Sequence, residues 1–252
     1  MRDSRSPDLT RWVATNQTPA DLIQSASCEA LLEFDVLVWD HAIGELLGAV
    51  GRNISEGQER SHPYLFMNIS TKSLELPKRL MSYVDAFTKE FPSVVFQLPT
   101  SGIGQSLVEL SQHRRQYPAV RLALGEFGTR HADLLQVSEL SLDYLVLHHS
   151  TRTRLDAPPL DAAWTGLLHG CSTAGISIII EGLTAADTDS LRYWYAIGAR
   201  LFKGDMLCPA VNADWLRANR EIRFPALSRF ADELAKQHGP EPDPNRPSKS
   251  TT

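Results

Sequence analysis

Short apolar runs alternate with helical patterns over most of the chain. Six runs have the length and composition of strands, at Tyr64–Ile69, Val94–Leu98, Val120–Leu124, Tyr144–Leu147, Ile176–Ile180 and Arg200–Phe202. Helical periodicity lies between them, for example at Leu74–Phe91, Leu160–Ala174 and Ala185–Ile197. Strands that are apolar throughout are typical of a parallel sheet covered on both faces. The pattern therefore predicts an α/β fold built from βα units, and periodicity alone leaves an open sheet and a closed barrel as alternatives.

Two helices are predicted before the first strand. Thr18-Pro19-Ala20-Asp21 combines a capping residue, a proline at the first helical position and an acid three residues after the cap, which is a helix start. Leu22, Ile23, Ala26 and Ala30 follow at helical spacing. A second apolar pattern runs from Val36 to Val50 and ends at Gly51.

The two ends of the chain differ from its middle. Residues 1–6 are polar, and residues 239–252 hold four prolines and almost no apolar side chains, so both segments are predicted to be disordered. A single domain is expected over residues 7–238.

Composition excludes several classes of protein. The net charge of −5 argues against a nucleic-acid polymer as partner, and no apolar run approaches the roughly 18 residues of a membrane span. The three cysteines are far apart and odd in number, which favours reduced thiols in a cytoplasmic protein over a disulfide framework.

Polar residues end or directly follow each of the six predicted strands. They are Asn68, Gln97, Glu126, His148, Glu181 and Lys203. The carboxyl ends of parallel strands meet at one end of an α/β fold, where ligands and substrates bind. We therefore expect these six side chains to converge on one site.

Five motifs in order along the chain show a resemblance to a known family. They are Tyr-Leu-Phe-Met-Asn-Ile-Ser (64–70), Gly-Glu-Phe-Gly-Thr (125–129), Asp-Tyr-Leu-Val-Leu-His (143–148), Glu-Gly-Leu (181–183) and Lys-Gly-Asp-Met-Leu (203–207). Their order and spacing resemble those of EAL domains, the bacterial cyclic-di-GMP phosphodiesterases, from about residue 7 to residue 215. The resemblance implies a modified TIM-type (β/α) barrel, with the family's first strand missing or replaced in this chain.

The residues that depart from the family pattern are those that carry its chemistry. The family's Glu-Ala-Leu aligns with Pro7-Asp8-Leu9, a metal-binding Glu with Gln97 and the Asp pair with Gly125-Glu126. The catalytic Lys aligns with Val146, and the Asp two residues later with His148. A Gln of the family aligns with Lys203. Asn68 and Glu181 are retained as they stand.

Charge arithmetic predicts that catalysis has been lost. Two-metal hydrolysis places two dications about 3.5–4 Å apart, and Mg²⁺ prefers carboxylate ligands. Glu126, Glu181 and Lys203 together supply a formal charge of only −1. Like charges about 4 Å apart cost roughly 4 kcal/mol per unit pair at an effective dielectric constant of 20. We therefore expect no catalytic residues, no metal site and no Mg²⁺ cofactor.

Three hypotheses for function follow. The first is a catalytically inactive EAL-like regulatory protein in cyclic-di-GMP-linked signalling, which binds a protein partner or a second copy of itself. The second is a cyclic-di-GMP receptor without turnover, in which Arg11, Asn68, Glu181 and Lys203 contact the ligand. The third is an enzyme with residual or altered metal chemistry, for which His131, His148, His149 and Glu181 are candidate zinc ligands. His148 and His149 are expected on one strand, pointing to opposite faces.

Overall fold

The computed structural model describes residues 25–50, 64–100, 103–127, 140–151, 160–184 and 186–207. The helices are α3 (Cys28–Val50), α4 (Pro77–Glu90), α5 (Ile103–Gln116), α7 (Leu160–Thr173) and α8 (Thr188–Ala196), with short 3-10 helices η1 (Thr71–Glu75) and η2 (His149–Thr151). The strands are β1 (Leu65–Asn68), β2 (Val94–Leu98), β3 (Leu122–Phe127), β4 (Tyr144–His148), β5 (Ser177–Glu181) and β6 (Leu201–Phe202). The predicted ends of the chain, 1–6 and 239–252, and the predicted helix start at Thr18 lie outside the described residues.

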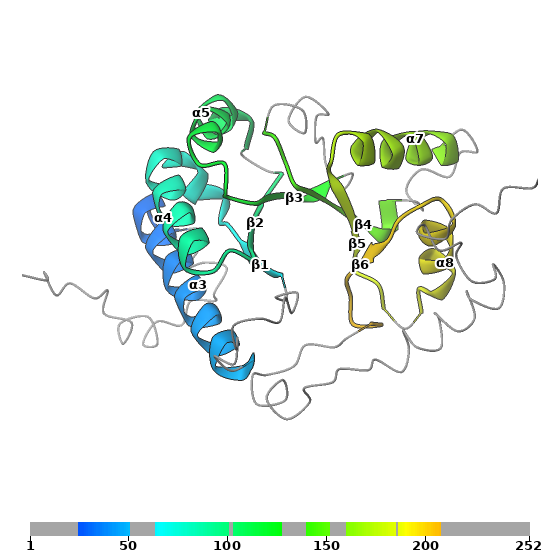
Figure 1. Ribbon diagram of the computed structural model, residues 1–252, viewed down its shortest axis with the longest axis horizontal. Helices are drawn as coiled ribbons and strands as arrows, with labels where there is room; N and C mark the ends of the chain where they lie inside the picture. Colours follow the sequence, from blue (N-terminus) through cyan, green and yellow to red (C-terminus); the bar gives the residue numbers. More distant parts are fainter. Residues whose placement is uncertain are drawn as a thin grey trace, which may run out of the picture.

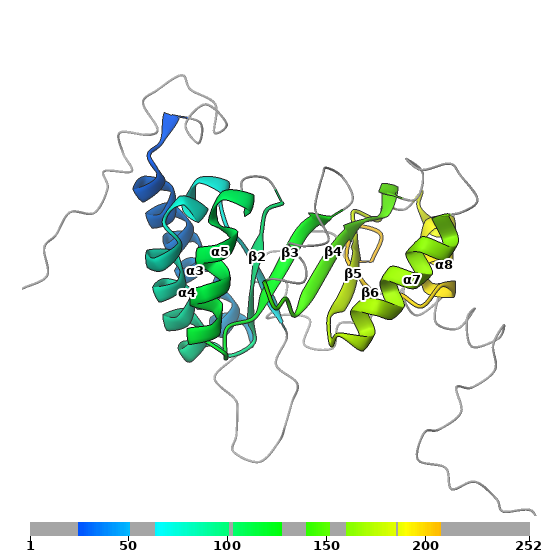
Figure 2. The same cartoon turned by 90° about the horizontal axis from the view of Figure 1, so that it is seen from above.

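The six strands form one parallel sheet in which each strand pairs with the next along the chain. The sheet curls into an arc with the helices on its outer side, α3, α4 and α5 over one half and α7 and α8 over the other (Figures 1 and 2). This confirms the predicted α/β fold. The six described strands form a curled half-barrel, which favours the barrel over a flat open sheet among the alternatives that periodicity leaves open.

Side chains that alternate along each strand fill two separate layers. The outward layer, with Phe96, Leu122 and Leu124, packs against the helices in the main core. The inward layer, with Val95, Ala123, Val146 and Ile179, forms a smaller cluster on the concave face. Strands covered on both faces need no polar alternation, which explains their continuous apolar runs.

Tryptophans hold the helices onto the sheet. Trp164 of α7 and Trp194 of α8 are buried and meet edge to face, with ring centroids 5.5 Å apart. Trp39 of α3 packs in the same way on Phe96 of β2, at 4.8 Å. The sequence places these tryptophans in helices, and their burial identifies them as core residues.

The first described helix begins earlier than the apolar pattern from Val36 to Val50 predicts. The chain breaks its helical course at Ala26 and Ser27, and α3 runs from Cys28, so that Ala30 belongs to the second helix and not to the first. The Ser27 hydroxyl accepts a hydrogen bond from the Ala30 N–H at 3.2 Å, which is the action of a helix cap. Within the described residues, no helix combines the length and the hydropathy that a bilayer crossing requires.

Candidate functional site

A cavity of about 470 Å³ lies at the carboxyl ends of the strands. Five of the six predicted strand-end residues line it, together with neighbours from the following loops: Asn68, Ile69, Thr71, Gln97, Leu98, Pro99, Gly125, Glu126, Glu181 and Lys203. His148 is not among the lining residues, and Arg11 lies outside the described part of the chain. The parallel register brings Asn68 beside Gln97 and His148 beside Glu181, because paired strands end at the same level.

Helix α3 holds the end of β1 in place. The Trp39 indole N–H donates to the Asn68 carbonyl at 3.0 Å. The buried carboxylate of Asp35 accepts hydrogen bonds from the Ser70 N–H at 2.8 Å, the Ser70 hydroxyl at 2.7 Å and the Ser73 hydroxyl at 2.8 Å. Burial raises the pKa of Asp35, and the hydrogen bonds oppose that shift. Asn68 and the loop after it are therefore fixed from outside the sheet.

Gln97 and Gly125 lie against each other on neighbouring strands. A Cβ atom on Gly125 would come within 2.6 Å of the Gln97 side-chain nitrogen, so the Gln97 side chain occupies the space of a side chain at position 125. Among the described residues, the buried Oε1 atom of Gln97 has no hydrogen-bond partner. The ends of β2 and β3 thus bring together an amide and a glycine, neither of which carries a charge.

Glu126 reaches the cavity through an irregularity in β3. The pairing of β3 with β4 shifts register between Leu124 and Phe127, and Glu126 has a positive φ of 54°. A left-handed residue inside a strand is typical of a bulge, which redirects a side chain. Glu126 is exposed, whereas Gly125 before it is buried.

Glu181 and Lys203 form an ion pair in the cavity wall. The Lys203 ammonium lies 3.5 Å from Oε2 of Glu181, and the two side chains are 56% and 15% exposed. β5 and β6 hold them together, since the Lys203 N–H donates to the Ile180 carbonyl at 2.8 Å. The glutamate at the end of β5 therefore has an ammonium group beside it.

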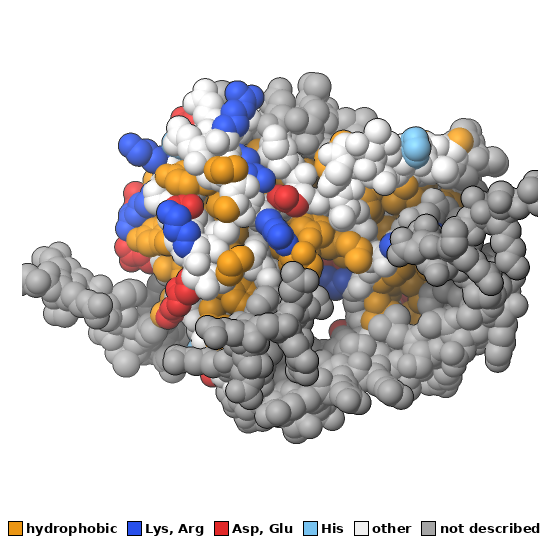
Figure 3. Space-filling view, viewed as in Figure 1, with side chains coloured by type: hydrophobic (Ala, Val, Ile, Leu, Met, Phe, Trp, Pro, Cys, Tyr) orange, Lys and Arg blue, Asp and Glu red, His pale blue; other side chains and the backbone are white. Residues whose placement is uncertain are grey.

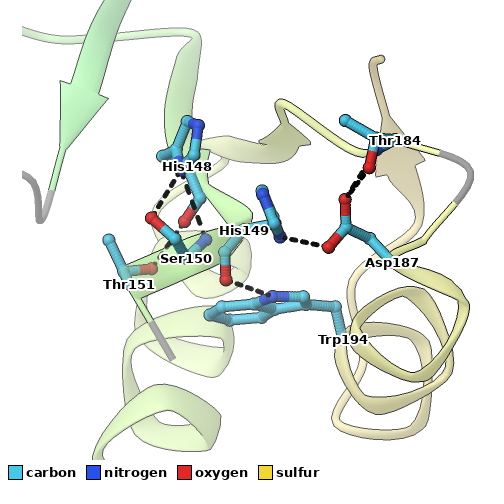
Figure 4. A network of polar contacts seen from close by, with 7 residues as sticks. All are labelled: His148, His149, Ser150, Thr151, Thr184, Asp187 and Trp194. Carbon is cyan, nitrogen blue, oxygen red and sulfur yellow. Dashed lines mark hydrogen bonds and ion pairs between the residues drawn. The ribbon is translucent and has the colours of Figure 1, made fainter. Parts of the chain in front are cut away.

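The two histidines lie beside the cavity in a separate polar network (Figure 4). The expectation that they share a strand and point to opposite faces is wrong, because β4 ends at His148 and His149 begins η2. Their rings lie 4.8 Å apart. Nδ1 of His148 is 2.7 Å from the Ser150 hydroxyl, and its Nε2 atom lies over Gly182, where a Cβ atom would come within 2.5 Å.

Asp187 joins η2 to the start of α8 in that network. Its carboxylate lies 3.5 Å from Nδ1 of His149 and accepts hydrogen bonds from the Thr184 hydroxyl and the Thr184 N–H. The Thr184 hydrogen bonds lower the pKa of Asp187, and His149 acts in the same direction. Trp194 donates its indole N–H to the His149 carbonyl at 3.4 Å (Figure 4). Both histidines thus have local partners.

A second cavity, of about 350 Å³, lies deeper on the concave face. Most of its walls are aromatic or aliphatic, and Gln97 and Lys203 line both cavities: Tyr64, Phe66, Gln97, Tyr144, Val146, Ser177, Ile179, Leu201, Phe202 and Lys203. Tyr64 and Phe66 each meet Tyr144 edge to face across it. Figure 3 shows hydrophobic side chains gathered over the strands near the middle of the molecule and charged ones over α3, α4 and α5.

Comparison with known proteins identifies the family. The model of the EAL domain family matches residues 8–210, which is most of the chain. The chain belongs to the EAL domain family. No curated protein matches it in sequence.

Solved EAL structures share the fold of this chain at low sequence identity. The EAL enzyme Bd1971, in a form with cAMP and cyclic-di-GMP bound, has a TM-score of 0.62 and 16% identity over 79% of this chain and 54% of its own. The EAL domain of DcpA from Mycobacterium smegmatis has a TM-score of 0.61 and 18% identity, over 74% and 83%. The phosphodiesterase PaMucR, in complex with c-di-GMP, has a TM-score of 0.57 and 17% identity, over 75% and 81%. This chain thus spans about half the length of Bd1971.

The cavity carries little negative charge on its described lining. Its lining includes two carboxylates, and the ammonium of Lys203 lies beside one of them. Gln97 and Gly125 provide no negative charge. Within the described ranges, no three His, Cys, Asp or Glu side chains are grouped so as to hold a metal ion.

Several residues that shape the site were not predicted from the sequence. Thr71 and Pro99 line the cavity from the loops after β1 and β2, and Asp35 and Trp39 act from a helix in front of the sheet. The sequence signal for Asp35 is an acid between the apolar residues Phe34 and Val36. A carboxylate that such a helix buries needs hydrogen-bond partners.

Proposed function

We propose that this chain is a non-catalytic member of the EAL family that acts by binding another protein in cyclic-di-GMP-linked signalling. The Glu181–Lys203 ion pair is the observation that carries the proposal. An ammonium 3.5 Å from the glutamate repels a divalent cation at that position. The exchange of carboxylates for Gln97 and Gly125 supports the same conclusion, since Mg²⁺ needs anionic oxygen ligands.

Regulation through a protein partner also fits the expected compartment. Free thiols at Cys28 and Cys171 support a cytoplasmic location. A protein that keeps its fold while its metal ligands change can still present a shaped surface, because fold and chemistry reside in different residues.

A hydrolysis assay tests the loss of catalysis. Purified chain is incubated with cyclic-di-GMP and either Mg²⁺ or Mn²⁺, with Glu181→Ala as the paired control. We expect no linear dinucleotide from either protein. Linear product that the Glu181→Ala variant fails to make would contradict the proposal, because it would show that the retained glutamate still supports turnover.

The second candidate function is a cyclic-di-GMP receptor without turnover. The polar cavity of about 470 Å³ favours it, because Lys203 and Asn68 on its wall can pair with a phosphate and hydrogen-bond a ligand. Calorimetric titration with the nucleotide tests this function. Binding that weakens in both Lys203→Ala and Arg11→Ala supports a receptor, and no heat of binding to the unmodified chain rejects it.

A further inference from the structure

The outward face of α3 carries large apolar side chains instead of polar ones. Phe34, Leu37 and Val38 are 42%, 45% and 44% exposed, and they make up three of the five exposed large hydrophobic side chains in the described residues. At helical spacing they lie opposite Asp35, Trp39 and Ile43, which face the core. A surface helix normally directs charged residues to this side, so an apolar stripe here is typical of a docking surface.

The same helix is acidic. It carries Glu29, Glu33, Asp35, Asp40 and Glu45 and neither lysine nor arginine. Asp35 is buried beneath the helix, while Glu29, Glu33 and Asp40 are exposed along one side of the apolar stripe. Arg79 of α4 lies 3.3 Å from Glu33 and offsets part of this charge.

The stripe also has room for close approach. A Cβ atom on Gly44 would meet no atom within 4 Å, and His41 and Gly44 continue the stripe one and two turns after Leu37. Glycine on an exposed helix face lets the backbone of another helix come near.

We propose that this face of α3 binds an amphipathic helical segment of another protein, with lysine or arginine residues beside its apolar stripe. The inference rests on the proposed function, that the chain acts by binding a protein, and it specifies the surface and the partner's chemistry. Apolar burial supplies the attraction, and the acidic side of α3 selects a basic partner. A second copy is disfavoured as the occupant, because two α3 helices would bring acidic side chains against each other.

The probe is a designed helical peptide, about five turns long, with one apolar face and lysine residues on the other face. A control peptide has glutamate in place of each lysine. Fluorescence anisotropy with the full chain should show binding of the lysine peptide and at least about tenfold weaker binding of the glutamate peptide. Hydrogen exchange should slow in residues 28–48 when the lysine peptide is bound.

Two glycine variants localise the binding. Gly44→Arg places bulk and a positive charge in open space on α3, and Gly166→Arg does the same on α7, where a Cβ atom also meets nothing within 4 Å. Both glycines are exposed helix positions, so neither substitution should disturb folding. Gly44→Arg should weaken binding of the lysine peptide about tenfold, while Gly166→Arg leaves it within about twofold.

Several outcomes would overturn the inference. They are equal binding of both peptides, equal weakening by both glycine variants, a dimer of the free chain that Gly44→Arg dissociates, and binding to phosphatidylcholine–phosphatidylglycerol vesicles in preference to the lysine peptide. The hydrolysis assay separates this inference from the proposed function. Turnover with intact peptide binding would reject only the non-catalytic proposal, and no turnover with no peptide binding would reject only the α3 surface.

Discussion

Lys203 supplies the positive charge among the described lining residues of the cavity and offsets one of the two carboxylates. Its ammonium lies 3.5 Å from the Glu181 carboxylate, and it is the cation among the cavity's lining residues. The pair is partly exposed, so its contribution to stability is below about 1 kcal/mol. Its effect on ion binding is larger, because a divalent cation beside Glu181 would lie close to a like charge.

Replacing Lys203 by glutamine should therefore increase the affinity of the cavity for Mn²⁺. The substitution removes the positive charge, and Lys203→Arg is the matched control because it keeps that charge. Calorimetric titration of both variants and the unmodified chain with Mn²⁺ measures the effect. Identical Mn²⁺ affinity in Lys203→Gln and Lys203→Arg would show that this charge does not control metal binding.

Asp35 makes stability depend on pH in the acid range. Burial raises its pKa in the folded protein, so the folded state holds the proton more tightly than the unfolded state does. The stability that Asp35 contributes is fully present below the unfolded-state value of about 4 and falls as pH rises through the folded-state pKa.

The unmodified chain and Asp35→Asn should accordingly differ in a pH-dependent way. The free energy of unfolding of the unmodified chain should decline, relative to that of the variant, as pH rises above about 4, and the difference should then level off. Urea unfolding at a series of pH values measures it. If the free energy of unfolding of the unmodified chain instead rises with pH relative to that of Asp35→Asn, the three hydrogen bonds outweigh burial and lower the pKa of Asp35.

At the scale of elements, the segments that follow β5 and β6 approach each other very closely through their backbones. Gly204 has a φ of 153°, and a Cβ atom there would collide with the backbone of Leu183. The Leu183 N–H donates to the Lys203 carbonyl at 3.4 Å, and the Met206 N–H donates to the Leu183 carbonyl at 3.1 Å. This contact keeps Lys203 next to Glu181.

Gly204→Ala should therefore destabilise the protein by about 3 kcal/mol, from the unfavourable φ together with the collision. Gly198→Ala is the matched control, because Gly198 also has a positive φ, of 113°, but open space around its Cβ position. Thermal unfolding should show a clearly larger loss for Gly204→Ala. Equal losses would show that backbone conformation alone, and not the contact with Leu183, matters there.

The position of each strand could be predicted from the sequence, but the end of β3 could not. Val94–Leu98 is β2 in the structure because a short apolar run bounded by a proline on each side, Pro92 and Pro99, is too short for a helix. The apolar run at Val120–Leu124 gave no sign that β3 continues through Gly125 and Glu126 to Phe127. Bulges depend on the pairing of the neighbouring strand, which a single segment of sequence does not contain.

At the scale of the whole molecule, stability should be greatest in the middle of the sheet. β3 and β4 each have a strand on both sides, and Leu122, Leu124, Leu145 and Leu147 are fully buried. β6 is short, and Leu201 is 42% exposed. Amide hydrogen exchange should be slowest in β3 and β4 and faster by orders of magnitude in β6. Equal protection of β6 and β3 would contradict this gradient.

The convergence of strand ends could be predicted from topology, but the contacts among the side chains could not. Parallel strands in sequential order bring Asn68, Gln97 and Glu181 to one end whatever their rotamers. The position of Gln97 over Gly125 and the pairing of His149 with Asp187 depend on rotamers and on loops after the strands. Such details are decided by packing between segments far apart in sequence.

Adjacent residues of helix α3 face the solvent and the segment that ends at the cavity. Phe34 and Val38 are exposed to solvent. Their neighbours Trp39 and Asp35 form hydrogen bonds with Asn68 at the end of β1 and with Ser70 in the loop after it. A bound segment that rotated or shifted this helix would displace Asn68 and Ser70 through the hydrogen bonds of Trp39 and Asp35. Cyclic-di-GMP titrations with and without the lysine peptide would detect such a movement, because Asp35 and Trp39 bond to the segment that ends at the cavity.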